Sequence, residues 1–458
     1  MLKLAVVGAG WAGMAAAVEA ASRGAEVTVF EAARTLGGRA RALPAILPDG
    51  STAALDNGQH ILIGAYANCL ALMQKVGIDL SQALLSLPLS LPHADGSGLH
   101  TPSWAIGWPA PLDALAAIAT TRGWRWRERL ALVGTSLRWR RQGFNCDPQF
   151  TVAELCADLP VRVQQELIEP LCVSALNTPM VNASAAVFLT VLRDALFGPG
   201  VAGFSGSSLL LPRTDLSQLF PDAAARWLQQ QDGSTGTSRL RIGTRVSMLR
   251  PQGAQWVLGH EDGEDVFDAV IWATAASPAE KTVRQAADAC DDATGAVLMA
   301  WARSARALNH TAISTVYAWS ADARLPAPML ALRAEPAGGA PAPAQFVFDR
   351  GQLNPLDRSA QGLLAFVISA SSDDRDTLQA QVLEQAARQL GLHGLQPVQT
   401  VVEKRATFAC TPGLVRPAQA ITQGLWAAGD YVEGPYPATL EGAVRSGLAA
   451  ARSATPAP

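Results

Sequence analysis

The sequence predicts an α/β fold in which a discontinuous nucleotide-binding domain carries an inserted mixed α+β domain. The first observation is a strand, a glycine-rich turn, an alanine-rich helix and a second strand near the start of the chain, which open a parallel βαβ unit. The second observation is that strand-like patterns typical of such a domain return in the middle and near the end. The segments are residues 3–7, 8–13, 14–22, 26–30, 239–275 and 424–451.

The other elements follow from local patterns of apolar and turn residues. Four amphipathic stretches predict helices over residues 151–230, and another is expected at 376–391. Turn residues at 233–236 and 262–263 separate the middle strands. A Pro/Gly/Ala segment at 334–344 predicts a loop, because the strand-like sequence QFVFD follows it directly. The expected nucleotide-binding domain comprises 1–85, 235–280 and 405–458, and the inserted substrate domain comprises 86–234 and 281–404.

Composition limits the class of protein. The chain has 458 residues, of which 49% are hydrophobic and 16% are charged, so it is not a disordered chain and can bury two or three domain cores. Its formal net charge of −3 argues against nucleic acid as a partner, because a nucleic-acid binder is usually basic. The six cysteines form no CxxC pair, so we expect free thiols and no metal site.

The glycine-rich turn has the spacing of a dinucleotide site. Gly8 permits the tight turn, Gly10 lets the backbone approach a pyrophosphate, and Gly13 allows close helix packing. Glu31 follows the second strand, where a carboxylate accepts hydrogen bonds from ribose hydroxyls. A glycine-rich turn in a helical hairpin is the alternative, but the strand–turn–helix–strand–acid order favours a Rossmann-like site. The neighbouring residues Trp11, Ala12 and Ala32 belong to the predicted site.

Three further motifs extend the site. The sequence LGGRAR places an arginine beside two glycines directly after the second strand, where a guanidinium can pair with phosphate. A surface turn is the alternative for this motif. The sequence LDNGQH follows at 55–60, and GD followed by PATLEGAV stands near the other end of the chain. The residues that these motifs add to the site are Gly37, Gly38, Arg39, Gly58, Gln59, His60, Gly429, Asp430, Ala438, Thr439 and Leu440.

Together these motifs resemble the FAD-dependent amine oxidase and phytoene desaturase superfamily over most of the chain. The resemblance implies an amine-oxidase-like fold and FAD as cofactor, with Gly429 and Asp430 at the ribityl chain. It also implies cofactor contacts from Ala273, within DAVIWAT at 268–274, and from Val246, on the strand before it. Further sequences resemble the squalene-associated branch, the hydroxysqualene dehydroxylases. They are PLCVSALNTP, FLTVLRDALFGPG, LLLPRTDLSQLFPDAAARWL, EKRATFACTP and PATLEGAVRSG.

The branch resemblance implies that reduced FAD converts hydroxysqualene to squalene in squalene and hopanoid synthesis. The substrate is an apolar isoprenoid, and a proton donor is needed near the flavin. His60 and Asp56 lie in a motif near the flavin, with His60 as the catalytic candidate and Asp56 as a structural hydrogen-bonding residue. Tyr431 and Tyr436 are further candidates, and Tyr66 is expected to pack on a helix.

Two other interpretations keep this fold. A carotenoid-type desaturase or an amine oxidase would move hydride from the substrate to the flavin. A non-enzymatic prenyl-binding protein would have lost flavin contacts, and the presence of Glu31, Arg39 and Asp430 argues against it.

A basic section lies at residues 122–141. It carries seven arginines and one acid, Glu128, with Trp124, Trp126 and Trp139 among them. Arginine with tryptophan suits the surface of an anionic membrane, whereas a solvated helix face is the alternative. The glycines of the first apolar run argue against a signal peptide, so we expect a cytoplasmic protein attached peripherally to the inner membrane face, with its substrate tunnel opening there. The oligomeric state is left open.

Overall fold

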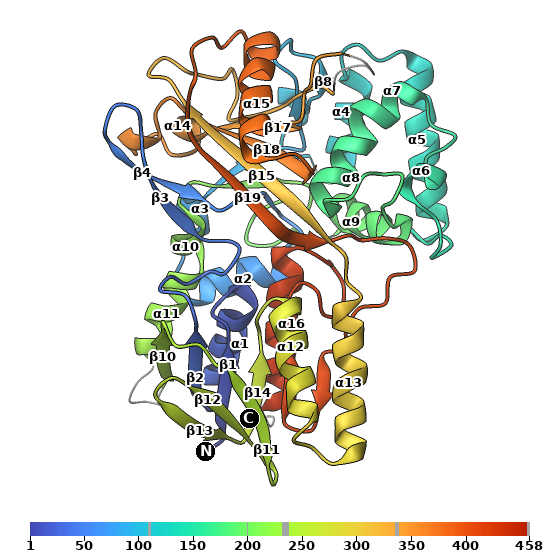
Figure 1. Cartoon of the computed structure of the whole chain (residues 1–458). Coiled ribbons are helices and arrows are strands. Elements are labelled where there is room, and N and C mark those ends of the chain that lie inside the picture. The colour runs from blue at the N-terminus through green and yellow to red at the C-terminus, as the bar shows by residue number, and fades with distance from the viewer. Residues whose placement is uncertain (109–110, 199, 231–237, 335–338, 456–458) are drawn as a thin grey trace.

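The computed structural model describes residues 1–108, 111–198, 200–230, 238–334 and 339–455. The turn expected at 233–236 and part of the loop at 334–344 lie outside these ranges. Figure 1 shows two halves, with the first and last helices side by side in one and a second sheet with a cluster of helices in the other. Within the described ranges, no helix has both the length and the apolar character needed to cross a membrane.

The first half is built on a six-stranded sheet whose inner strands are parallel. β1 lies between β2 and β14, so the turn that follows it opens at the carboxyl edge of the sheet. Helices α1 (Trp11–Ser22) and α16 (Leu440–Ala454) pack against each other beside this sheet, although they come from opposite ends of the chain. In spatial order the strands are β10 (Ser238–Ile242), β2 (Glu26–Glu31), β1 (Lys3–Val7), β14 (Ala269–Trp272), β21 (Leu425–Ala427) and β20 (Ala420–Thr422).

Smaller elements complete this half. An antiparallel sheet of three strands comes before β14 in the chain, and two helices come after β14. These elements are β11 (Met248–Gln252), β12 (Gln255–His260), β13 (Gly263–Phe267), α12 (Ala276–Ala287) and α13 (Asp292–Arg306). The remaining elements are β3 (Ala42–Ile46), β4 (Thr52–Asp56), β5 (Leu62–Ile63), α2 (Ala67–Lys75), α3 (Leu80–Ala83), β6 (Leu84–Leu87), β9 (Leu209–Pro212), α10 (Leu216–Leu219) and α11 (Pro221–Gln230).

The second half contains an antiparallel sheet with one face covered by a helix. Along β17, Val347 packs in the cluster that includes residues of helix α15, whereas Phe346 and Phe348 point to the opposite face, as strand alternation requires. That opposite face is directed toward the first half. The elements are β15 (His310–Trp319), β16 (Met329–Ala331), β17 (Phe346–Asp349), α14 (Arg350–Leu353), η3 (Arg358–Ala360), β18 (Leu363–Ser371), α15 (Arg375–Leu390) and β19 (Gln396–Phe408).

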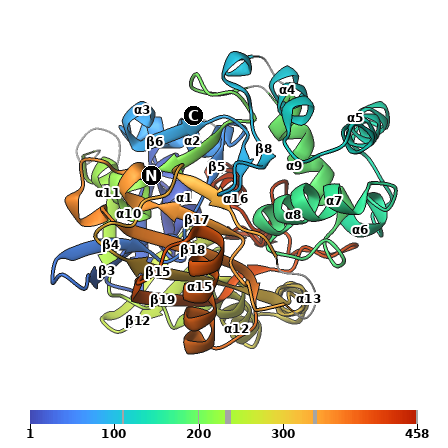
Figure 2. The ribbon, with the colours of Figure 1, turned by 90° about the horizontal axis from the view of Figure 1, so that it is seen from above.

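A group of helices lies to one side of this sheet, as the view from above shows (Figure 2). Residues 151–230 are largely helical as expected, except that β9 pairs with β5 and β6. The elements of this part are β7 (Leu91–Pro92), β8 (Gly98–Leu99), η1 (Ser103–Ala105), α4 (Leu112–Thr120), α5 (Trp126–Arg141), α6 (Val152–Leu155), α7 (Val161–Val163), η2 (Gln164–Ile168), α8 (Glu169–Leu176) and α9 (Ala185–Phe197).

The division between the halves differs from the expected boundaries. Strand β9 pairs with β5 and β6, and α11 packs against both α10 and α1, so residues 209–230 belong with the nucleotide-binding half and not with the inserted domain. Helix α12 runs across the expected boundary at residue 280 and carries α13 into the same half, and strand β19 runs across the boundary at 404. Sequence patterns locate the elements, whereas the packing partners of α11 and α12 decide to which half they belong.

Candidate functional site

A cavity of about 690 Å³ lies where the carboxyl ends of the central strands meet the inner face of the second sheet. Its lining combines the turns after β1, β2 and β14 with the start of α16. Side chains of β15, β17, β18 and β19 and the end of α8 complete it. Segments that are far apart in the sequence therefore share one site between the two halves.

The glycine turn after β1 gives the cavity a backbone surface. Gly8 has φ +106°, and a Cβ there would lie 2.8 Å from the carbonyl oxygen of Ala273. A Cβ on Gly13 would lie 1.8 Å from the carbonyl oxygen of Gly8, so this glycine allows close packing. Gly10 is the N-cap of α1 and has no side chain to cap it, which leaves the first amides of the helix available to an anion. The turn therefore fits a pyrophosphate.

Glu31 ends β2 at the edge of the cavity. One carboxylate oxygen accepts from the backbone N–H of Ala9 at 2.7 Å, and the other accepts from the N–H of Ala33 at 2.8 Å. These bonds hold the carboxylate in one orientation beside the turn. Each oxygen keeps a further acceptor position, which suits the paired hydroxyls of a ribose.

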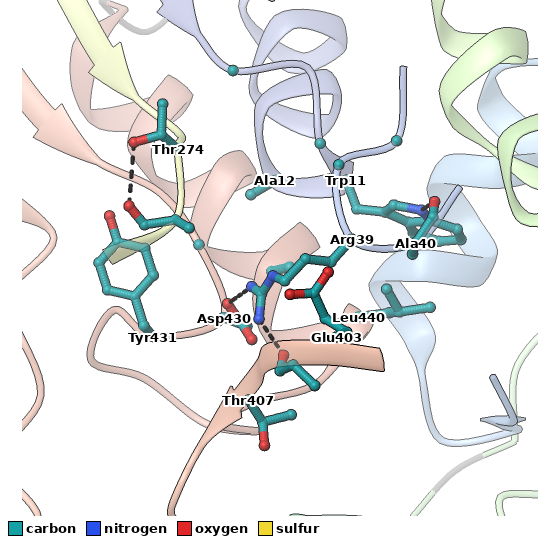
Figure 3. Close-up of a pocket in the computed structure, with 18 of the residues that line it drawn as sticks. Trp11, Ala12, Arg39, Ala40, Thr274, Glu403, Thr407, Asp430, Tyr431 and Leu440 are labelled. Atoms are coloured by element: carbon teal, nitrogen blue, oxygen red, sulfur yellow. Dashed lines mark hydrogen bonds and ion pairs between the residues drawn. The ribbon is translucent and has the colours of Figure 1, made fainter. Parts of the chain in front are cut away.

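Arg39 and Asp430 meet across the cavity. A guanidinium nitrogen of Arg39 lies 2.5 Å from the carboxylate of Asp430, and the guanidinium also donates to the carbonyl oxygen of Ala406 on β19. Figure 3 shows the guanidinium between Asp430 and the strand that carries Thr407, with Glu403 beside it. The glycine–glycine–arginine and glycine–aspartate motifs, 391 residues apart, thus form one polar wall.

Four side chains add polar groups to the lining; Tyr431 is buried, and Gln59, His60 and Tyr66 are half-buried. Burial, together with the charge of Arg39, lowers the pKa of His60 to about 4, so the imidazole is neutral at pH 7. Burial raises the pKa of both Tyr66 and Tyr431, so these phenols keep their protons. Within the described ranges, the amide nitrogen of Gln59 and the hydroxyl of Tyr431 are buried without a hydrogen-bond partner. Such groups call for a polar ligand in the cavity.

Nineteen of the twenty residues predicted for the site line this cavity, and Gly13 lies behind it in the packing of α1. Val246 lines the cavity, but the expectation that it lies on a strand is wrong, because it stands in the connection between β10 and β11. Tyr66 lines the cavity as well as preceding α2, a role that the sequence did not indicate. Tyr436 does not line it, because its hydroxyl donates to Asp194.

Asp56 is fully buried outside the cavity lining and makes structural hydrogen bonds, as expected. Its carboxylate accepts from the N–H of Leu216 at 2.8 Å and from Arg350 at 3.0 Å. Its carbonyl oxygen accepts from the hydroxyl of Tyr317 at 2.9 Å. Sequence reasoning missed Arg350 and Tyr317, because no local pattern links them to Asp56.

Asn177 is another residue of the lining that the sequence did not single out. It ends α8 in the left-handed conformation, with φ 46°, which Asn adopts more readily than most residues. Its amide nitrogen donates to the hydroxyls of Thr311 at 2.8 Å and Thr407 at 2.9 Å, and its amide oxygen accepts from the N–H of Ala370 at 2.7 Å. It therefore fixes the end of α8 against β15, β18 and β19.

Comparison with known proteins agrees with this site. A family model described as flavin containing amine oxidoreductase matches residues 11–455. The chain is 26% identical over 485 aligned residues to a hydroxysqualene dehydroxylase of Rhodopseudomonas palustris, covering 97% of this chain and 96% of the relative. It is 39% identical over 116 residues to a carotenoid phi-ring synthase of Streptomyces griseus, but this match covers 25% of the chain and 22% of that protein. A zeta-carotene desaturase of Zea mays is 38% identical over 78 residues, covering 17% of this chain and 13% of the relative.

Solved structures show the same fold. An oxidoreductase from Methanosarcina mazei matches with a TM-score of 0.69 and 15% identity, covering 98% of this chain and 99% of that one. Cyclohexylamine oxidase from Brevibacterium oxydans matches with a TM-score of 0.62 and 16% identity, covering 99% of this chain and 98% of that one. The family match, together with the cradle of Gly8, Gly10 and Glu31, identifies FAD as the cofactor.

Proposed function

The chain belongs to the flavin containing amine oxidoreductase family, and we propose that this FAD-dependent oxidoreductase reduces hydroxysqualene to squalene. The observation that carries the proposal is the match along nearly the whole chain to a hydroxysqualene dehydroxylase. The carotenoid enzymes match over a quarter of the chain or less. Hopanoid synthesis is the process that this product would serve.

The wall of the cavity supports an apolar substrate. The side chains that β15, β17 and β18 direct into it are mainly aliphatic or aromatic, namely Ile313, Phe346, Phe348 and Val367, with Ser369 as the polar exception. The inner face of the sheet can therefore hold a hydrocarbon chain and exclude water from the reacting carbon. The glycine turns and the Arg39–Asp430 pair supply polar groups to the lining, and Glu403 and Thr407 of β19 add others.

The cofactor-binding residues divide between the two ends of an FAD molecule. Gly8, Gly10 and the first amides of α1 would hold the pyrophosphate, and Glu31 would hold the adenosine ribose. Arg39 and Asp430 would face the ribityl and phosphate region, and the start of α16 at Thr439 would face the flavin. Reduced FAD, when bound, supplies a hydride to the substrate.

The proposed reaction consumes one hydride and one proton. Hydroxysqualene is an allylic alcohol; protonation lets its C–O bond break with loss of water, and the allylic carbon then forms a C–H bond. The protein must hold the chain of the substrate, keep other water away and deliver the proton. Among the donors considered for this step, His60, Tyr66 and Tyr431 line the cavity and carry an N–H or O–H at neutral pH. We retain His60 as the candidate donor; because its imidazole is neutral at pH 7, it would have to take up a proton before it could pass one to the leaving hydroxyl.

Anaerobic incubation of the chemically reduced holoprotein with hydroxysqualene tests the proposal. We expect squalene to form in an amount equal to the flavin reoxidised, with no squalene from the oxidised protein. Phytoene and simple amines, added to the oxidised protein, are the matched substrates for the desaturase and amine oxidase alternatives. Flavin reduction by either of these, with no squalene formed from hydroxysqualene, would contradict the proposed reaction while leaving the FAD site intact.

A further inference from the structure

Three neighbouring elements expose an unusual number of large apolar side chains. Helix α4 packs against both η1 and α5, and α4 and α5 lie along one edge of the molecule (Figure 2). The side chains of Trp104, Trp126 and Leu130 are 58%, 69% and 66% exposed. We call this surface the outer helical face; its apolar members are Trp104, Ile106, Trp108, Leu112, Leu115, Trp126, Leu130 and Leu137. Exposed apolar patches of this kind mark interaction surfaces.

Helix α5 is apolar on both sides. At about 100° per residue, Trp126, Leu130 and Leu137 lie within about 40° of one another on the exposed side. Leu132 and Trp139 are buried on the opposite side, which packs on the protein. We expected all three tryptophans of residues 122–141 to face a membrane. This is wrong for Trp124 and Trp139, whose rings are buried in the core. It remains a prediction for Trp126.

The preceding elements also expose large apolar side chains. On α4, Leu112 and Leu115 are exposed one turn apart, whereas Ala116 and Ala117 are buried. Before α4, the rings of Trp104 and Trp108 pack edge to face at 5.1 Å and both are exposed. Indole rings favour the boundary between headgroups and acyl chains of a bilayer.

Arginines lie on both sides of the apolar stripe of α5. On the same helical projection, Arg127 and Arg138 lie on one side of the stripe, and Arg129 and Arg140 lie on the other. The acids between Trp104 and Arg141 are Asp113 and Glu128. Asp113 is buried and accepts from Ser207 at 2.6 Å, and Glu128 accepts from the N–H of Arg125 at 2.6 Å. Arg138 pairs with Asp158 at 3.1 Å, and the other arginines at the margins keep the outer helical face cationic around its apolar centre.

We propose that the outer helical face docks in the plane of an anionic lipid bilayer. Apolar side chains enter the headgroup boundary, and the flanking arginines pair with lipid phosphates. An apolar stripe alone would be enough to bind a protein partner. Cations on both sides of the stripe fit an extended anionic surface, such as a bilayer, better. The inference rests on this surface and not on the proposed reaction, and residues 122–141 do not contribute to the lining of the FAD cavity.

Sedimentation with vesicles tests the proposal on the FAD-containing full chain. We expect binding to vesicles of equal parts phosphatidylglycerol and phosphatidylcholine, weaker binding to phosphatidylcholine alone, and release as salt screens the charges. Arg122, Arg127 and Arg141 make no ion pair among the residues that the structure describes, so they can be replaced together. The triple change to Gln should weaken partitioning by about 100-fold, which is about 3 kcal/mol.

The apolar part has its own variant and control. Trp126→Ser with Leu130→Ser should abolish binding to both vesicle types. Leu356→Ser with Val415→Ser, which changes two still more exposed apolar residues elsewhere, should leave binding unchanged. Arg303→Gln, Arg306→Gln and Arg375→Gln form the matched charge control. FAD content reports on folding in every variant.

Three results would overturn the proposal. The first is failure of the wild-type protein to sediment with anionic vesicles. The second is binding of the Trp126→Ser, Leu130→Ser variant to anionic vesicles as strong as that of the wild-type protein. The third is a wild-type oligomer, seen by light scattering, that these two substitutions convert to a monomer, because the face would then be an interface between copies of the chain.

Discussion

Arg350 donates a hydrogen bond to the carboxylate of Asp56 across 3.0 Å, although 294 residues separate the two in the chain. Both side chains are buried, and the same guanidinium donates to the amide oxygen of Gln59 at 3.0 Å. Asp56 ends β4 in the nucleotide-binding half, and Arg350 begins α14 in the other half. The pair therefore joins the two halves beside the loop that carries Gln59 and His60 into the cavity.

Replacing one member of this pair should destabilise the protein strongly. Arg350→Leu leaves a buried carboxylate without its cation, which costs about 3–5 kcal/mol of unfolding free energy. Arg250→Leu breaks an exposed pair with Glu264, whose atoms lie 2.7 Å apart, and should cost less than about 1 kcal/mol. Urea unfolding of the two holoproteins measures the difference. Equal losses would show that the buried pair does not hold the halves together.

The pair also predicts a pH dependence of stability. Burial raises the pKa of Asp56 from 3.8 to about 6, in spite of Arg350, so between about pH 4 and pH 6 the folded protein keeps a proton that the unfolded chain releases. The contribution of Asp56 to the unfolding free energy therefore falls as the pH rises through this window and is constant above it.

Asp56→Asn removes this dependence, so the difference in unfolding free energy between wild type and variant should change between pH 4 and 6 and be flat from pH 6.5 to 8. His60, whose pKa is lowered to about 4, adds stability as the pH rises toward 6.5. The contribution of His60 is the same in both proteins, so it cancels in the difference between their unfolding free energies. A difference that is flat over the whole range would argue against a buried, protonated Asp56.

Two glycines of the same motif should respond differently to a side chain. A Cβ on Gly10 would meet only the Cα of Gly38, at 3.9 Å, so Gly10→Val should fold but block the approach of the pyrophosphate. A Cβ on Gly13 would lie 1.8 Å from a backbone oxygen, so Gly13→Ala should lose stability instead. Flavin absorbance per polypeptide and thermal unfolding measure the two effects. A folded Gly10→Val protein with full FAD content would place the pyrophosphate elsewhere.

Glu31→Ala should weaken FAD binding by about 10- to 150-fold, because a charged hydrogen-bond acceptor is worth roughly 1.5–3 kcal/mol. Glu26, at the other end of β2, is the matched control, and Glu26→Ala should bind FAD like the wild type. Titration of the apoproteins with FAD gives both dissociation constants. If the two variants bind equally well, Glu31 does not contact the ribose.

FAD should be bound without a covalent link. Such links usually form through cysteine or histidine; the GDYVEGPYPATLEG sequence contains neither, and the described cavity lining contains no cysteine and one histidine, His60. Acid precipitation should therefore release all the yellow colour to the supernatant. If the wild-type pellet stays yellow and the pellet of the His60→Gln variant does not, FAD is linked covalently to His60.

The sequence by itself determined the nucleotide-binding motif and its neighbours. The Gly8–Gly13 turn, Glu31 and the Gly37–Arg39 turn depend on local backbone conformation and on the order of strand, turn and helix. Local interactions of this kind are encoded by residues close together in the chain. Nineteen of the twenty predicted residues line one cavity, but tertiary packing brings Val246, Ala273 and the residues of 429–440 to it. Resemblance to known motifs added the Gly429–Asp430 wall.

Only the tertiary structure decided which residues meet across long separations and which apolar side chains face outward. The pairing of Asp56 with Arg350 depends on how the two halves pack together, and no local sequence pattern predicts it. In α5, Trp126 and Trp139 are both large apolar residues at helical spacing, yet one is 69% exposed and the other 3%. A helix with apolar residues on both sides satisfies the same periodicity whichever side it buries, so the neighbouring elements decide which side packs against the core and which is left for a partner.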